Sequence, residues 1–187
     1  LPECPTIRDA ETLVVTDANN SRTASAFYTL EQPIDAFTAE FVYQVWAGTS
    51  SPADGVCFVL QNFAPTALGG GGGERGYIGM ASSVALMLDI YEGDPTGRGY
   101  QLGADGAYWP SSTTVNITPV DLVQPGSYPS RPVRVRLNYD GTLLSLDMEE
   151  LDINKEPLSP PETYHFEAPV DIPGEVGDTR AWVCLLY

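Results

Sequence analysis

Histidine, cysteine and basic residues are scarce in this chain of 187 residues, and each shortage removes a class of function. The only histidine is His165, and there are three cysteines. Catalytic zinc needs several His or Cys ligands at close spacing, so zinc chemistry is not expected. No Gly-x-Ser-x-Gly sequence leads into a helical pattern, so a serine hydrolase is not expected either. We therefore expect no catalytic residues and predict a protein that is not an enzyme.

The shortage of positive charge excludes two kinds of partner. Nine basic residues face 25 acidic ones, for a formal net charge of −16. A surface this negative repels phosphate backbones and anionic lipids, so neither nucleic acid nor an acidic membrane surface is an expected partner. No apolar run approaches the roughly 20 residues that cross a bilayer, so membrane insertion is not expected. The charge favours solubility in an extracellular setting, or else attracts divalent cations.

Two sequence signals bear on localisation. The chain begins at Leu1 rather than at a methionine, which suggests a processed or excerpted polypeptide. Asn19 and Asn116 each begin an Asn-x-Ser/Thr acceptor sequence, so both are candidate glycosylation sites. We therefore predict a secreted, extracellular or cell-surface glycoprotein.

The three cysteines leave two alternatives open. Cys57 and Cys184 both lie in apolar runs. They are either two buried thiols that act as small hydrophobic side chains, or one disulfide between neighbouring strands. With the disulfide, Cys4 would be free or bonded to a segment outside this sequence.

Long helical patterns are absent, and short apolar runs between turn residues predict one all-β domain over residues 1–187. The chain has 18 glycines and 16 prolines, which favour turns. Asp140-Gly141 between two such runs predicts a hairpin. The runs predict a two-sheet antiparallel sandwich. The predicted strands cover 12–16, 25–30, 37–46, 55–61, 84–91, 133–137, 143–148, 164–170 and 180–187.

Five consecutive glycines at 69–73 form the most unusual segment. Glycine loses more backbone entropy on folding than other residues, so a regular strand is not expected there. Either the backbone needs positive φ, or a ligand approaches the amides closely. A phosphate-binding loop is not expected, because no Gly-Lys-Ser/Thr follows.

Three motifs in a fixed order carry a family resemblance. Ala53-Asp54-Gly55 opens an apolar strand, the glycine loop follows, and the run 83–91 ends in Asp89-Ile90-Tyr91. Together with the segments 138–143 and 170–173, this order resembles the legume-type (L-type) lectins of the concanavalin A-like superfamily, and most closely their microbial members. The similarity extends from about Phe27 to the end of the chain. It implies a jelly-roll sandwich and a lectin-like, carbohydrate-binding function.

The resemblance also implies a sugar site. Asp54, following a cis peptide bond from Ala53, would accept hydrogen bonds from sugar hydroxyls, and the amide of Gly72 or Gly73 would donate one. The family has an asparagine two residues after the aromatic residue, where this chain has Gly93.

A calcium site beside the sugar loops is the corresponding metal expectation. By resemblance, Asp89, the Tyr91 carbonyl and Asp94 would contribute oxygen ligands together with Asp54, and calcium takes six to eight oxygens. Family ligands are replaced by Met87 and Arg98, so a transition metal is not expected. Either calcium binds, or Asp89 accepts hydrogen bonds from loop amides without a metal.

Other residue sets have competing interpretations. Asp147, Glu149 and Glu150 have the strand spacing of jelly-roll glycosidase carboxylates, but an exposed acidic strand face is the expected alternative. Tyr100, Tyr108 and Trp109 would stack on a sugar, pack in the core or contact another chain.

Two functions are therefore predicted. The first is a secreted module that binds glycans or glycoproteins. The second is a structural subunit of an extracellular assembly with a degenerate sugar site. The sequence stops in an apolar run at Tyr187, where similar domains continue into a closing strand. We expect that strand to come from a longer chain or from another protein chain.

Overall fold

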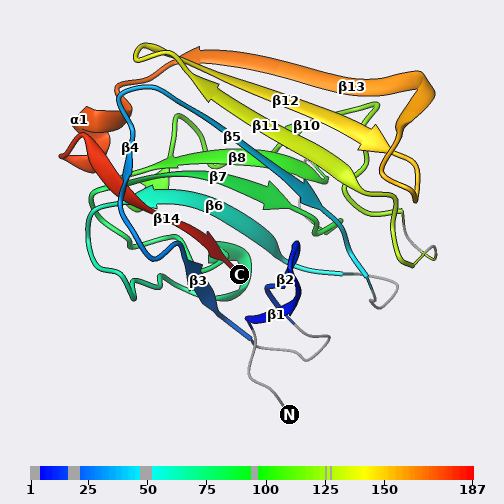
Figure 1. Ribbon diagram of the computed structural model, residues 1–187, viewed down its shortest axis with the longest axis horizontal. Helices are drawn as coiled ribbons and strands as arrows, with labels where there is room; N and C mark the ends of the chain where they lie inside the picture. Colours follow the sequence, from blue (N-terminus) through cyan, green and yellow to red (C-terminus); the bar gives the residue numbers. More distant parts are fainter. Residues whose placement is uncertain (1–4, 17–21, 47–51, 94–96, 125, 127) are drawn as a thin grey trace.

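Two antiparallel sheets packed face to face form the body of the protein in the computed structural model (Figure 1). The structure describes residues 5–16, 22–46, 52–93, 97–124, 126 and 128–187. The larger sheet has the order β10-β8-β7-β6-β14-β3, and β4 and β9 pair with β14 and β8. The smaller sheet has the order β13-β12-β11-β5. The predicted all-β sandwich is confirmed.

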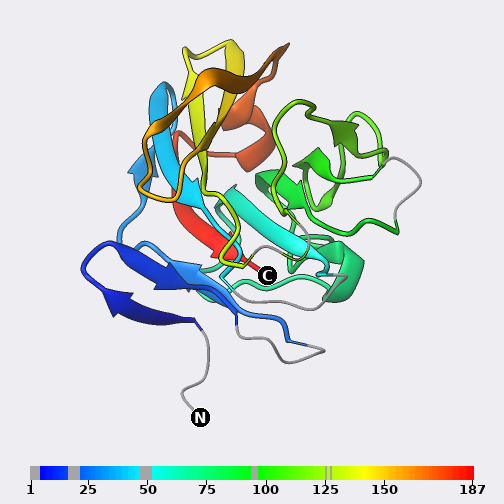
Figure 2. The same ribbon diagram turned by 90° about the vertical axis from the view of Figure 1, so that its right-hand side faces the viewer.

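The element bounds follow the predicted runs closely in the centre of each sheet. The larger sheet contains β3 (Ser25–Phe27), β4 (Gln32–Pro33), β6 (Gly55–Gln61), β7 (Ser83–Asp89), β8 (Gly99–Ala104), β9 (Ala107–Tyr108), β10 (Val115–Asn116) and β14 (Arg180–Leu186). The smaller sheet contains β5 (Phe37–Tyr43), β11 (Val133–Tyr139), β12 (Leu143–Leu151) and β13 (Pro157–Pro169). A two-stranded sheet of β1 (Thr6–Asp9) and β2 (Thr12–Val14) lies at the lower side of both views (Figure 2).

Strands with an alternating apolar pattern and strands with a continuous apolar run differ in which of their residues are buried. In β11 every second residue is buried between the sheets, while Arg134 and Arg136 face outward. By contrast, all seven residues of β6 are buried. A second apolar cluster, which includes Cys57, Tyr77 and Met87, covers the other side of the larger sheet. The continuous apolar run at 55–61 therefore marks a strand covered on both faces, as the sequence predicts.

The predicted hairpin at Asp140-Gly141 joins β11 to β12. The Asp140 carboxylate accepts hydrogen bonds from the amides of Thr142 and Leu143, each at 2.8 Å. These amides lower the pKa of Asp140, because they favour its charged form. The hairpin sets the register of the sheet, in which Leu137 pairs with Leu146.

Several elements were not predicted, and β8 shows why. Its sequence contains Gly99, Gln101 and Gly103, which do not suggest a buried strand. A Cβ atom on Gly103 would lie 2.2 Å from the Tyr77 ring, so glycine is needed for close packing there rather than for a turn. The short strands β1, β4, β9 and β10 have too few residues for a periodic signal.

Two short helical elements also lie outside the strand predictions. A 3-10 turn covers Gly72–Glu74 within the glycine loop. Helix α1 (Ile172–Val176) begins after Asp171, whose carboxylate accepts a hydrogen bond from the Gly174 amide at 2.9 Å. No helix among the described residues is long and apolar enough to cross a membrane.

The cysteine alternatives are resolved in favour of thiols. Cys57 and Cys184 are buried and are not joined to each other. Burial raises the pKa of Cys184 to about 12 and also raises that of Cys57. Cys4 lies outside the described residues.

Candidate functional site

Asp54 lies at the start of β6, and its backbone is fixed from several directions. The Ala53–Asp54 peptide bond is cis, as the resemblance implies. The Asp54 carbonyl accepts hydrogen bonds from the Ile90 amide at 3.1 Å and from Nε of Arg75 at 3.2 Å. The Ala53 carbonyl accepts one from the Tyr187 hydroxyl at 3.0 Å. These contacts determine the direction in which the Asp54 side chain points.

The Asp54 carboxylate lines an open pocket with a volume of about 440 Å³. It is half-buried and has no hydrogen bond or ion pair with any residue that the structure describes. Glu74 adds a second carboxylate, while Tyr91 and Tyr108 add aromatic rings. The lining residues are Asp54, Gly71, Gly73, Glu74, Arg75, Tyr91, Gln101, Tyr108 and Ser112. The pocket thus combines hydrogen-bond acceptors with aromatic surface.

The glycine loop forms one wall because it folds back on itself. The Gly69 amide donates to the Gly76 carbonyl, and the Gly76 amide donates to the Gly70 carbonyl. A Cβ atom on Gly70 would lie 1.5 Å from the Glu74 carboxylate, so a larger residue would displace that carboxylate. Close packing therefore explains part of the glycine run.

Gly72 and Gly73 form the tip of this loop next to Asp54. A Cβ atom on Gly72 would lie 3.8 Å from Oδ2 of Asp54. The Tyr108 hydroxyl donates to the Gly73 carbonyl at 3.3 Å, which holds the tip in place. Neither glycine amide donates to an acceptor within the described part of the chain. The pocket therefore offers N–H donors close to a carboxylate, and neither kind of group has a partner among the residues that the structure describes.

Gly93 has a different role from the one that the resemblance implies for its position. A Cβ atom on Gly93 would lie 2.4 Å from the hydroxyl oxygen of Tyr91, so the Tyr91 ring occupies the space of a side chain at 93. Tyr91 is 42% exposed and lines the pocket. An aromatic ring thus lies where the resemblance implies an asparagine side chain.

Below the pocket, Asp89 and Arg75 form a buried ion pair. Oδ2 of Asp89 lies 2.5 Å from Nη2 of Arg75, and both side chains are less than 5% exposed. Asp89 also accepts hydrogen bonds from the Thr114 hydroxyl at 2.8 Å and from the Tyr91 amide at 3.0 Å. Nη1 of Arg75 donates to Oε1 of Gln101 at 2.7 Å. Every polar group of this pair thus has a partner beneath the pocket.

These residues do not fit the calcium that the resemblance implies. Both carboxylate oxygens of Asp89 are already bonded, and Oδ2 faces a guanidinium group rather than an open space. Asp94 lies outside the described residues. No group of three or more His, Cys, Asp or Glu side chains among the described residues could hold a metal ion.

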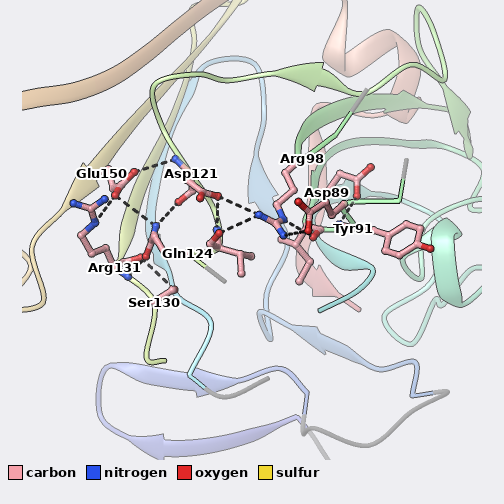
Figure 3. Close-up of polar contacts among 11 residues, drawn as sticks. Asp89, Tyr91, Arg98, Asp121, Gln124, Ser130, Arg131 and Glu150 are labelled. Carbon is pink, nitrogen blue, oxygen red and sulfur yellow. Dashed lines mark hydrogen bonds and ion pairs between the residues drawn. The ribbon is translucent and has the colours of Figure 1, made fainter. Parts of the chain in front are cut away.

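Arg98, at the other position where the family has a ligand, links two loops (Figure 3). Its guanidinium donates to the Ile90 carbonyl at 3.0 Å and to the Val123 carbonyl at 3.2 Å, and lies 3.1 Å from the Glu92 carboxylate. Polar contacts continue through Asp121 and Gln124 to the buried Glu150, which pairs with Arg131 at 2.6 Å (Figure 3). The loop after β7 is therefore anchored by a cationic side chain.

The glycosidase-like carboxylates do not form one site. Asp147 lies 2.7 Å from Nδ1 of His165, and Glu149 lies 2.6 Å from Nη1 of Arg134 on the exposed face of the smaller sheet. The third, Glu150, is buried, where burial raises its pKa. The expected acidic strand face is confirmed for Asp147 and Glu149, while the adjacent Glu150 lies on the opposite, buried face of β12.

The remaining predicted positions are distributed over the molecule. Tyr100 is buried in the core and Trp109 packs against it, whereas Tyr108 faces the pocket. Asn116 is exposed on β10, and its Oδ1 accepts hydrogen bonds from Thr118. Asn19 lies outside the described residues.

Sequence reasoning missed Arg75 and Gln101, whereas stacking on a sugar was one of the interpretations left open for Tyr108. One signal was available for Arg75, because this arginine lies two residues after the glycine run in a chain that has few basic residues. Gln101 gave no signal, since the segment around it does not suggest a buried strand. Its role depends on β8 lying beside β7, which only the three-dimensional structure shows.

Comparisons with known proteins show the same fold. No family model matches the chain, and no curated protein matches it. Among solved structures, a peanut lectin bound to a nine-residue peptide is 18% identical, with 90% of this chain and 75% of the lectin covered and a TM-score of 0.65. The metal-free form of lectin I-B4 from Griffonia simplicifolia is 17% identical, with 95% and 80% covered and a TM-score of 0.68.

A lumenal protein gives a similar match. The exoplasmic/lumenal domain of VIP36, bound to Ca²⁺ and Man3GlcNAc, is 11% identical, with 97% of this chain and 79% of that domain covered and a TM-score of 0.53. The chain thus has the L-type lectin (concanavalin A-like) fold.

Proposed function

We propose that this protein is a secreted, carbohydrate-binding, lectin-like module and not an enzyme, and that its sugar site is the pocket at Asp54. One observation carries the proposal: a half-buried carboxylate without a described protein partner lies beside free glycine amides and two tyrosines. A sugar presents adjacent hydroxyls that both donate and accept hydrogen bonds, together with C–H faces that pack on aromatic rings. The pocket offers a complement to each.

Each lining residue then has a definite task. Asp54 accepts hydrogen bonds from two hydroxyls, and charged acceptors form the stronger kind of hydrogen bond. The amide of Gly73, or of Gly72 beside it, donates to a sugar oxygen. The exposed Tyr91 ring packs on the sugar. Gly93 belongs to the site indirectly, because its lack of a side chain leaves room for that ring.

The negative charge of the pocket favours neutral ligands over acidic ones. Asp54 and Glu74 both line the pocket, and the chain carries a formal charge of −16. An acidic sugar would be repelled by these carboxylates, so neutral glycans are the proposed ligands. Secretion and glycosylation at Asn116 and Asn19 are consistent parts of the same proposal, since lumenal and extracellular proteins meet glycans.

A glycan array with three proteins tests this function. The wild type, Asp54→Asn and Asp35→Asn should be compared at equal concentration. Asp35 is an exposed acid just before β5, and the start of β5 lies at the opposite end of the sandwich from the start of β6 (Figure 1). We expect wild type and Asp35→Asn to bind the same neutral glycans, and Asp54→Asn to lose at least about tenfold in affinity, because hydrogen bonds to a charged acceptor are replaced by weaker ones.

The structural alternative has its own supporting observation. The Tyr91 ring occupies the place of the family's asparagine side chain, so the usual polar contact is lost. Absence of binding by the wild type to every glycan would contradict the lectin proposal. It would favour a subunit of an extracellular assembly that retains the fold without the sugar site.

A further inference from the structure

We infer that the Arg75 guanidinium serves as the fixed cation of this site, so that the Asp54 loop is held in place without a divalent metal. The inference goes beyond sugar binding, because it concerns how the site is assembled and not what occupies it. It depends on the contacts of one side chain, which reaches from the glycine loop to the start of β6, the end of β7 and the interior of β8.

The Arg75 guanidinium lies where oxygen atoms from three segments converge. Its three nitrogens contact three neighbouring segments of the larger sheet: Nε donates to the Asp54 carbonyl just before β6 at 3.2 Å, Nη2 pairs with Asp89 at the end of β7 at 2.5 Å, and Nη1 donates to Gln101 within β8 at 2.7 Å. All three acceptors are oxygens that converge on one point. Convergent oxygens around a single positive charge are what a bound cation requires, and here a side chain supplies that charge.

The groups around Arg75 are arranged for a planar guanidinium rather than for a spherical ion. A guanidinium is planar and presents several N–H donors in fixed directions. Gln101 is oriented to accept, because its own amide nitrogen donates to the Ser112 carbonyl. Arg75 itself is held at φ 51°, where its amide donates to the Gly72 carbonyl at 2.8 Å. The loop that forms the pocket wall thus also places the cation.

Asp89 needs no positive charge besides that of Arg75. Its carboxylate is fully buried, and an unpaired buried charge is strongly unfavourable. Arg75 neutralises this charge, while Thr114 and the Tyr91 amide complete its hydrogen bonds. A divalent ion at this point would have to displace a guanidinium that is itself only 4% exposed.

Arg98 supports the same conclusion on the next loop. Its guanidinium contacts the Ile90 and Val123 carbonyls and the Glu92 carboxylate (Figure 3). Two arginines therefore link the loops around the pocket, and both are anchored in backbone oxygens. They account for two of this acidic chain's nine basic residues.

Thermal unfolding of the wild-type protein is the first test. The protein is dialysed against EDTA, and its melting temperature is then measured in EDTA, in millimolar CaCl2 and in millimolar MnCl2. We expect the three melting temperatures to agree, and calorimetric titration with CaCl2 to give no binding heat. A calcium-dependent rise of several degrees, or a saturable heat at one ion per chain, would overturn the inference.

Two matched variants give the second test. Arg75→Met removes the buried guanidinium, whereas Arg136→Met removes an exposed one that pairs with Glu40 at 2.6 Å on the smaller sheet. We expect Arg75→Met to lower the melting temperature by roughly 10 °C and Arg136→Met to change it little. Equal effects of the two substitutions would overturn the inference. The wild-type measurement stands even if Arg75→Met does not fold, and none of these results depends on sugar binding.

Discussion

Oδ2 of Asp89 and Nη2 of Arg75 lie 2.5 Å apart beneath the pocket, with both side chains almost fully removed from solvent. Asp89 ends β7, and Arg75 ends the 3-10 turn of the glycine loop. The pair therefore joins a core strand to the loop that forms the pocket wall. It explains why the loop tip stays next to Asp54 although the tip belongs to a run of five glycines.

Asp89→Asn should therefore destabilise the fold. The substitution leaves the buried Arg75 charge uncompensated, and breaking a buried pair costs about 3–5 kcal/mol. The free energy of unfolding, measured by urea denaturation, should fall by that amount. The control is Asp35→Asn, an exposed acid, for which a change within about 0.5 kcal/mol is expected. Equal stability of Asp89→Asn and wild type would contradict the role of the pair.

Substitution of glycine by alanine should affect the melting temperature differently at Gly55 and at Gly73. A Cβ atom on Gly55 would lie 1.9 Å from the Leu88 carbonyl oxygen, and its φ of 145° disfavours other residues. A Cβ atom on Gly73 meets nothing within 4 Å. Gly55→Ala should lower the melting temperature strongly or prevent folding, whereas Gly73→Ala should leave it nearly unchanged. A tolerated Gly55→Ala would show that β6 and β7 are not paired as described.

Tyr91→Ala tests the aromatic contribution to binding. If its exposed ring packs on the sugar, the substitution should weaken glycan affinity by about tenfold or less, because such contacts contribute about 0.5–1.5 kcal/mol. Tyr28→Ala is the control, since Tyr28 is 59% exposed, follows β3 and is not among the residues that line the pocket. Calorimetric titration measures both. An unchanged affinity for Tyr91→Ala would exclude ring stacking at this position.

His165 should show a pKa above its ordinary value of 6.5. The cause is its hydrogen bond to Asp147, at 2.7 Å, which favours the protonated ring. Because the folded-state pKa is raised, any stabilisation by this pair is present below the unfolded pKa and is lost as the pH rises through the folded value. NMR titration of the ring should show the raised pKa and a decrease in Asp147→Asn. A pKa of 6.5 or below in the wild type would contradict the contact.

The sequence predicted the fold well because the relevant signals are local. The alternation in β11, the continuous run of β6 and the Asp140-Gly141 turn each lie within a few residues. The Asp54 turn could also be placed, because the resemblance rests on a short motif. The expectation of calcium ligands did not include Arg75, because this residue meets Asp89 only through tertiary packing.

The roles of Gly93 and Gln101 also depend on tertiary packing and could not be predicted from the sequence. Gly93 appeared only as a missing asparagine, and no local pattern shows that the Tyr91 ring fills the space. Gln101 became a partner of Arg75 through the pairing of β8 with β7. Roles that depend on register between distant strands are not carried by a one-dimensional pattern.

NMR mapping of a bound glycan tests the central claim most directly. Isotope-labelled protein in metal-free buffer is titrated with a neutral glycan that the array identifies, and amide shifts are followed. The account predicts that the largest shifts occur at Asp54, Gly72, Gly73, Tyr91 and Tyr108, with saturation in the presence of EDTA. Shifts centred on another surface, such as the outer face of β12 and β13, would contradict it.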